Sequence, residues 1–218
     1  MNTSFPVDLV LFGMIAAFLV LRLRSILGRR TGFERQAPPL RPAAESPIIE
    51  ARPEPLAPST PARPLPDAGS APGMALAAMS AKDRNFSAGA FLAGAEKAFR
   101  MIVAAFADSD RARLRPLLGD ELYGAFDQAI AAREANGERQ HAEVRSIPTA
   151  SIEAVALHDN QASITVKFVS DQVSYTTGKD GQVTSGNEAV TELTDIWTFE
   201  RDLTSRDPSW KLVAAQVG

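Results

Sequence analysis

The hydrophobic residues follow three different patterns along the chain. Near the N-terminus an uninterrupted apolar run covers the 13 residues from Leu9 to Leu21. Residues 36–79 show no periodicity and are rich in Pro and Ala. After that, apolar residues recur first at helical spacing and then at every second position. We therefore predict an anchor with a basic flank at residues 1–35, a disordered linker at 36–84 and a folded domain at 85–218.

The N-terminal apolar run is long enough to cross a membrane. The stretch from Phe5 to Leu23 would measure about 28 Å as a helix, close to the thickness of the hydrocarbon core. A cleaved signal peptide is the alternative, but no Lys or Arg precedes the run and no small-residue cleavage pattern follows it. Arg22, Arg24, Arg29 and Arg30 follow it instead. The positive-inside rule then predicts a single-pass protein with its N-terminus outside and its domain in the cytoplasm.

The middle segment has the composition of a tether. Eleven of the 15 prolines lie between Pro38 and Pro72, and repeated x-Pro steps favour extended backbone that buries no core. Such a chain lets the domain range over several tens of ångströms from the bilayer. Residues 55–58 and 61–64 also match a PxxP ligand, although this composition makes the pattern common.

Helical spacing predicts three helices at the start of the domain. Residues 88–107 form a long amphipathic helix with Ser87 as a candidate N-cap. A short helix with basic residues then begins at Asp110 and breaks near Pro116. The third helix runs from Asp120 to Gly137, a favourable C-cap. The apolar positions of the long helix are Phe91, Ala95, Phe99, Ile102, Val103 and Phe106, and those of the third are Leu122, Tyr123, Phe126 and Ile130.

The rest of the domain alternates with a period of two. Ala162, Ile164, Val166 and Phe168 alternate with polar residues, and similar strands are predicted at about 144–157, 188–202 and 209–217. Helices followed by antiparallel hairpins indicate an α+β fold. A twisted four-stranded sheet needs a cover, so its concave face should wrap the aromatic side of the first and third helices. This arrangement is a cone with a cavity at its wide end.

Composition excludes several kinds of chemistry. The chain has no Cys, which rules out disulfides, thiol catalysis and zinc sites built on cysteine. Residues 80–218 contain 15 basic and 20 acidic side chains, a balance that argues against nucleic acid as a partner. His141 and His158 are too isolated to predict a metal site, and no phosphate-binding G-x-x-x-x-G-K loop occurs. We predict no cofactor and no metal.

One possible catalytic group is Asp195. It shares a strand face with Leu193, Trp197 and Phe199, where burial would raise the pKa of a carboxylate and suit it to act as a general base. The other polar candidates for such a pocket are Tyr123, Tyr175 and Asp171. We favour the simpler interpretation, in which Asp195 anchors a loop or pairs with a basic side chain such as Arg201.

Five segments together resemble a known family. They are residues 20–32 (VLRLRSILGRRTG), followed by the Pro-rich linker; 91–99 (FLAGAEKAF); 114–118 (LRPLL); 194–201 (TDIWTFER); and 207–212 (DPSWKL). Their order and spacing are similar to bacterial members of the Tim44-like family, related to the motor-scaffold subunit of the mitochondrial inner-membrane translocase. The resemblance implies the cone-shaped fold of the nuclear-transport-factor-two-like superfamily, in agreement with the periodicity.

The resemblance also implies a function. Mitochondrial members tether an Hsp70 motor to the preprotein channel and associate with anionic lipid of the inner membrane. Here an apolar anchor and a Pro-rich linker replace their long charged N-terminal region, so the motor-tethering role transfers only weakly. We expect a non-enzymatic adaptor or scaffold on the cytoplasmic face of the inner membrane, binding a client protein, a chaperone or lipid. A cone enzyme acting on a small hydrophobic substrate is the alternative.

Two groups of residues are expected to form the binding surfaces. The residues expected to line an apolar pocket are Phe91, Ala95, Phe99, Val103, Tyr123, Phe126, Ile130, Phe168 and Trp197. The residues expected to approach anionic headgroups are Arg111, Arg113 and Arg115. The alternative for the three Arg is a solvated face paired with Asp108, Asp110, Asp120 and Glu121.

Overall fold

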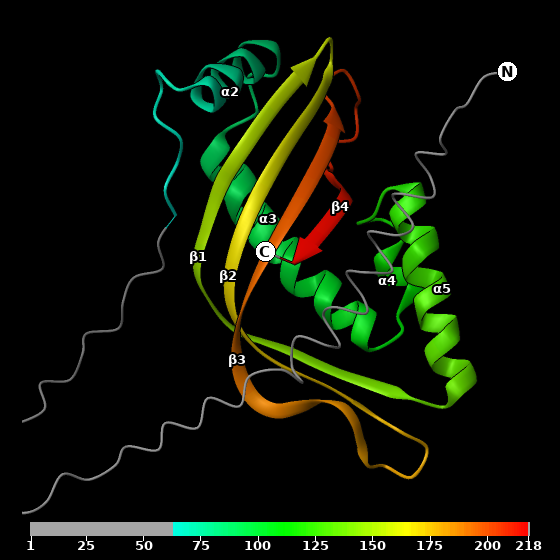
Figure 1. The fold of residues 1–218 in the computed structure, drawn as a ribbon. Helices are drawn as coiled ribbons and strands as arrows, with labels where there is room; N and C mark the ends of the chain where they lie inside the picture. The colour runs from blue at the N-terminus through cyan, green and yellow to red at the C-terminus, as the bar shows by residue number, and fades with distance from the viewer. Residues whose placement is uncertain (1–62, 218) are drawn as a thin grey trace, which may run out of the picture.

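A computed structural model describes residues 63–217, which form four helices and one four-stranded antiparallel sheet (Figure 1). The helices are α2 (Ala71–Lys82), α3 (Ala88–Ala107), α4 (Arg111–Leu114) and α5 (Asp120–Asn136). The strands are β1 (Arg139–His158), β2 (Gln161–Thr177), β3 (Val183–Asp202) and β4 (Lys211–Val217). The predicted anchor and most of the linker lie outside these residues. None of the helices within residues 63–217 combines the length and apolarity needed to cross a membrane.

The sheet is a simple meander in the order β1-β2-β3-β4. A tight turn at Asp159, with φ of 51°, joins β1 to β2, and a turn at Gly181, with φ of 75°, joins β2 to β3. These positive φ values suit Gly and, among other residues, Asp and Asn. The predicted α+β class and the antiparallel four-stranded sheet are confirmed, although β2 continues well beyond the predicted alternation at Phe168.

The sheet bends sharply near Pro148. The β1–β2 register shifts between Ser146 and Thr149, where Pro148 cannot donate to the ladder, and also between Val144 and Ser146. Side chains satisfy carbonyls exposed by the bend: Arg100 Nη1 donates to Val144 O at 2.6 Å, and Arg63 Nη2 donates to Ile147 O at 3.0 Å. Beyond the bend, the start of β1 and the β2–β3 hairpin turn toward the C-terminal end of α5 (Figure 1).

Helix α3 lies against the concave face of the sheet and supplies most of the helical part of the core. The Phe99 ring stacks on Phe168 with centroids 4.6 Å apart and meets Trp197 at the same distance. Phe99 and Phe168 have no exposed surface, and Trp197 is 1% exposed. The predicted inward face of β2 is therefore confirmed. The helix begins as predicted at Ser87, whose Oγ accepts from Ala90 N at 3.1 Å.

Helix α5 closes the other side of the core. Phe126 packs on Phe106 of α3 with ring centroids 4.7 Å apart, and the helix ends at Gly137 in the left-handed conformation, as its sequence predicted. The segment before α5 covers the edge of β4. Gly119 N donates to Leu212 O at 2.8 Å, and Leu212 N donates to Leu117 O at 2.9 Å.

The domain begins earlier than the sequence predicted. Residues up to 84 were expected to be linker, but α2 packs on the domain with Leu76 7% exposed and Met79 fully buried. Ser70 caps this helix by accepting from Gly73 N at 3.1 Å. Pro72 lies in the first turn, where a helix tolerates proline. The Pro/Ala composition therefore concealed a helix whose buried residues are three positions apart.

We predict that Met79→Ala lowers the free energy of unfolding by about 2–4 kcal/mol, because it leaves a cavity beneath α2. Met74→Ala in the same helix is the control, because Met74 is 59% exposed and its truncation should change stability by less than about 0.5 kcal/mol. Urea denaturation measures both. Similar small losses for the two variants would mean that α2 does not belong to the folding unit.

Candidate functional site

The residues predicted to line an apolar pocket mainly fill the core. Phe99, Ile130, Phe168 and Trp197 are at most 1% exposed. The space that Trp197 borders between α3, α5 and β1 is about 10 Å³, no more than one water molecule needs. Val103 and Phe126 border this space, while Phe91 and Ala95 line an open groove on the other side of α3. Tyr123 lies half-buried beneath the guanidinium of Arg115, 4.9 Å from its ring centre.

The open groove, here called the α3 groove, lies between the α2–α3 junction, α3 and the loop joining β3 to β4. It encloses about 620 Å³. Its floor is aromatic: the rings of Phe91 and Trp210 are 4.7 Å apart, and Phe86 packs on Trp210 at 6.0 Å. Phe91 also meets Phe199 of β3 edge-on at 5.9 Å. Aromatic floors of this kind supply much of the energy at protein interfaces.

Small residues on α3 create this groove. Ala90, Gly94 and Ala98 line it, and a Cβ atom at Gly94 would meet nothing within 4 Å. Met101 stands on the same side of the helix with 43% of its surface exposed. The helix thus directs large side chains into the core and leaves room for an external side chain on its outer side.

Basic residues surround the groove. Lys82 and Arg84 come from the α2–α3 junction, and Arg206 comes from the β3–β4 loop. Asp83 pairs with Arg201 at 3.0 Å, with both side chains 11% exposed. Arg201 Nε is buried and has no acceptor among residues 63–217, an arrangement that typically costs about 1–3 kcal/mol.

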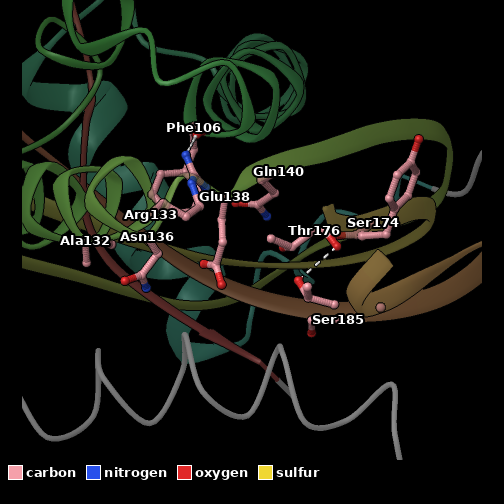
Figure 2. A pocket seen from close by; sticks show the side chains of 13 residues that line it. Phe106, Ala132, Arg133, Asn136, Glu138, Gln140, Ser174, Thr176 and Ser185 are labelled. Carbon is pink, nitrogen blue, oxygen red and sulfur yellow. Dashed lines mark hydrogen bonds between the residues drawn. The ribbon is translucent and has the colours of Figure 1, made fainter. Parts of the chain in front are cut away.

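A second cavity of about 340 Å³, here called the hairpin cavity, lies where the end of α5 faces the β2–β3 hairpin. Figure 2 shows Arg133, Asn136 and Glu138 on one side and Ser174, Thr176 and Ser185 on the other. Its apolar lining comes from Phe106, Ala129 and Ala132. Gly186 is required in the hairpin wall, because its φ is 76° and a Cβ there would lie 2.3 Å from Ser174 O.

Arg133 is a structural part of the hairpin cavity wall. Its guanidinium lies 4.7 Å from the Phe106 ring centre, and Nη2 donates to Phe106 O at 2.6 Å and to Ser109 Oγ at 3.2 Å. Nη1 donates to Gln140. Burial lowers the pKa of Arg133. Because these donors already have acceptors, Arg133 joins α5 to the end of α3.

The predicted catalytic candidates do not come together. Asp195 is 1% exposed and accepts from Gln172 Nε2 at 3.1 Å. The expected pairing with Arg201 is wrong, because Arg201 reaches Asp83 of the unpredicted α2 segment instead. Tyr175 stacks on His141 with ring centroids 4.7 Å apart and lines the hairpin cavity, whose lining does not include Asp195.

Two further candidates have local roles. Ser146 Oγ donates to Asp171 Oδ2 at 2.5 Å, a contact that ties β1 to β2 beside the bend. His158 is exposed at the β1–β2 turn. Within residues 63–217 no group of three or more His, Cys, Asp or Glu side chains is placed to hold a metal ion.

The three Arg near α4 are paired within the domain. Arg111 Nε donates to Asp127 at 2.5 Å and its Nη1 to Glu134 at 2.9 Å. Arg113 lies 3.8 Å from Asp110, and Arg115 donates to Asp120 at 2.7 Å. Two of the four expected carboxylate partners, Asp110 and Asp120, therefore do form pairs. Asp127 and Glu134 could not be foreseen, because they depend on how α5 packs beside α4. Lipid contact through these Arg stays a prediction.

We predict a pH-dependent effect of Arg111→Gln. Hydrogen bonding from Arg111 lowers the pKa of Glu134 below its ordinary 4.5. The stability that this hydrogen bond contributes is therefore fully present above pH 4.5. It disappears as the pH falls through the lowered pKa. The variant should therefore melt below the wild type near neutral pH, and the difference should narrow as the pH falls below the ordinary pKa of a Glu side chain. Arg113→Gln, at the longer 3.8 Å contact, is the control and should change the melting temperature less. A pH-independent difference for Arg111→Gln would contradict the assignment.

Comparison with known proteins gives one family and several structural likenesses. Curated proteins give no match. The intermembrane space region of chloroplast protein ARC6 is 14% identical with a TM-score of 0.43, covering 58% of this chain and 95% of that chain. A putative NTF2-like dehydratase from Streptomyces avermitilis is 15% identical with a TM-score of 0.34, covering 56% and 92%. An NTF2-like superfamily protein from Salmonella enterica is 8% identical with a TM-score of 0.36, covering 61% and 92%.

These structural scores carry no argument about function. The family match does, because the Tim44-like domain matches residues 73–217, well over half of the chain. The match begins within α2, in agreement with the earlier start of the domain. This chain belongs to the Tim44-like domain family.

Proposed function

We propose that this protein is a membrane-tethered adaptor that holds a client protein or chaperone in the α3 groove. Membership of the Tim44-like family indicates a scaffold or adaptor role in protein translocation. The observation that carries the finer proposal is the groove itself, which combines an aromatic floor with a volume of about 620 Å³. A protein segment can bury an apolar side chain there without displacing the core.

The chemistry of the groove supports binding over catalysis. The basic groups that line it are Lys82, Arg84, Arg201 and Arg206. Among residues 63–217 its one lining carboxylate, Asp83, is paired with Arg201. A guanidinium stays protonated at physiological pH and is a poor general acid or base. Such groups orient a partner's polar atoms while the aromatic floor supplies the contact area.

The predicted anchor and linker give the adaptor its location. In this proposal the apolar segment crosses the inner membrane, and the linker keeps the domain within several tens of ångströms of the cytoplasmic face. Within the described residues, Arg63 donates to Ile147 O at 3.0 Å and binds Glu96 of α3. In this proposal the tether therefore joins the domain beside β1.

We predict that filling the groove weakens client binding without unfolding the domain. Gly94→Leu places a side chain in the open space of the groove, and replacing a helix-interior glycine favours the helix. A photoreactive amino acid in place of the groove-lining Met101 should crosslink to the client in intact membranes. Gly94→Leu should reduce this adduct by about tenfold, the factor that corresponds to roughly 1.4 kcal/mol of binding energy.

Gly89→Leu is the matched control. Gly89 lies on the same helix, a Cβ there also meets nothing within 4 Å, and it does not line the groove. Adduct formation should persist in this variant. If both variants crosslink as well as the wild type, the groove is not the client site.

We also predict that external protease leaves residues 63–217 intact in sealed spheroplasts, because the basic residues beside the apolar run follow it in the chain. Immunoblotting for the C-terminal domain measures this protection, and lysed spheroplasts are the control. Digestion of the domain while a cytoplasmic marker stays protected would contradict the topology.

A further inference from the structure

We propose that the α3 groove selects acidic partner segments, in which an apolar anchor residue is flanked by carboxylates. This inference rests on the proposed function of the groove as the docking site for a client. It adds the chemistry by which a partner would be recognised. The apolar anchor would enter beside Gly94 and contact the aromatic floor, and the flanking carboxylates would meet the basic rim.

The basic residues stand on two different walls of the groove. Lys82 and Arg84 follow α2, whereas Arg206 belongs to the β3–β4 loop. Arg84 and Arg206 are exposed and form no ion pair within residues 63–217. Lys82 Nζ donates to Asp159 O and Asn160 Oδ1, which are neutral acceptors. All three charges therefore remain available to carboxylates of a partner.

The nearby carboxylates have local partners, although Asp202 and Asp207 keep their negative charge because those partners are neutral donors. Asp83 is paired with Arg201. Asp202 accepts from Thr204 N at 2.8 Å and from its Oγ1 at 2.7 Å, and Asp207 accepts from Ser209 N at 2.9 Å. These two Asp residues hold the β3–β4 loop together and do not line the groove. Among residues 63–217, the lining of the groove holds four basic side chains and the single carboxylate of Asp83, so its rim carries a net positive charge.

This positive rim runs against the charge of the surrounding domain. Residues 80–218 contain 20 acidic and 15 basic side chains. The three basic side chains beside the aromatic floor therefore form a positive patch on a domain whose net charge is negative. Charge complementarity of this kind sets which partner binds more than it sets how tightly. It favours acidic segments and disfavours basic ones.

The buried Arg201 supplies a further donor in the same wall. Its Nε has no acceptor among residues 63–217, although its Nη2 donates to Asp83 at 3.0 Å. A partner carbonyl or carboxylate that shifts this side chain slightly would provide the missing acceptor. Arg201 Nε lacks an oxygen acceptor among residues 63–217, and the carboxylates of an acidic segment are such acceptors.

Three labelled peptides test the proposal on the full-length chain in a nonionic detergent. Each has a central Trp-Leu pair, flanked by Glu in the first peptide, Gln in the second and Lys in the third. Fluorescence anisotropy should give the tightest binding for the Glu peptide, by about tenfold over the Gln peptide, with the Lys peptide weakest. The advantage of the Glu peptide should shrink at high salt, because exposed charges are screened.

Matched charge variants locate the selectivity. Arg84→Gln combined with Arg206→Gln should remove most of the preference for the Glu peptide. Arg139→Gln combined with Arg145→Gln changes the net charge equally, at exposed positions outside the groove, and should leave the preference intact. Gly94→Leu should block all three peptides.

The possible failures are distinguishable. If the three peptides bind equally and Gly94→Leu blocks them all, the groove binds apolar segments and the acidic preference is overturned while the proposed function stands. A preference that survives in the Arg84/Arg206 variant also overturns the acidic preference.

The chain's own acidic residues are a rival occupant of the groove. If changing Glu45, Glu50 and Glu54 to Gln makes the Glu peptide bind about tenfold tighter, the groove accepts this chain's own segment and the partner assignment is wrong.

Discussion

The stacking of Phe99 on Phe168 and Trp197 is the contact on which the rest of the domain depends. It fixes α3 in the concave face of the sheet, with ring centroids 4.6 Å apart in both pairs. Once this face of the helix is committed to the core, the opposite face must present Gly94 and Met101 outward. The groove on α3 is therefore a consequence of how the interior is packed. Loosening the stack would unfold the core and remove the groove together.

A second contact gives the groove its walls. The Asp83–Arg201 pair joins the end of α2 to β3, and at 11% exposure it is shielded far more than a surface ion pair. Removing one partner would leave a nearly buried charge without compensation, which is more damaging than losing an exposed pair. The pair holds the α2–α3 junction against the start of the β3–β4 loop. The basic rim is thus built from two segments more than a hundred residues apart in the chain.

The sequence predicted the parts of the fold that depend on local periodicity. The inward face of β2 from Ala162 to Phe168, the cap at Ser87 and the end of α5 at Gly137 follow from side-chain spacing and turn chemistry. It did not predict α2, because Pro72 and the surrounding Ala residues have linker composition, and only burial of Met79 against the sheet identifies the helix. The pocket prediction was right only in part, because Phe91 and Ala95 line the α3 groove whereas Phe99, Ile130 and Phe168 fill the core. Apolar spacing shows that Phe99 and Trp197 face inward, but whether such side chains enclose a space or fill it depends on their mutual packing.

Charged residues show the same limit, because spacing in the sequence does not reveal which charges the fold pairs. Arg111, Arg113 and Arg115 are close together in the sequence and were the natural candidates for an anionic surface. Each of them is already paired with a carboxylate of the domain, so a headgroup would have to replace an existing contact before it gained one.

The sequence does not identify Arg84 and Arg206 as a cluster, because they lie 122 positions apart. The fold brings both to one groove, where neither forms an ion pair within residues 63–217. A partner carboxylate would gain their charge without breaking a pair. Each exposed ion contributes little binding energy on its own. The cluster that binds a carboxylate without first breaking an ion pair is therefore the better binding site.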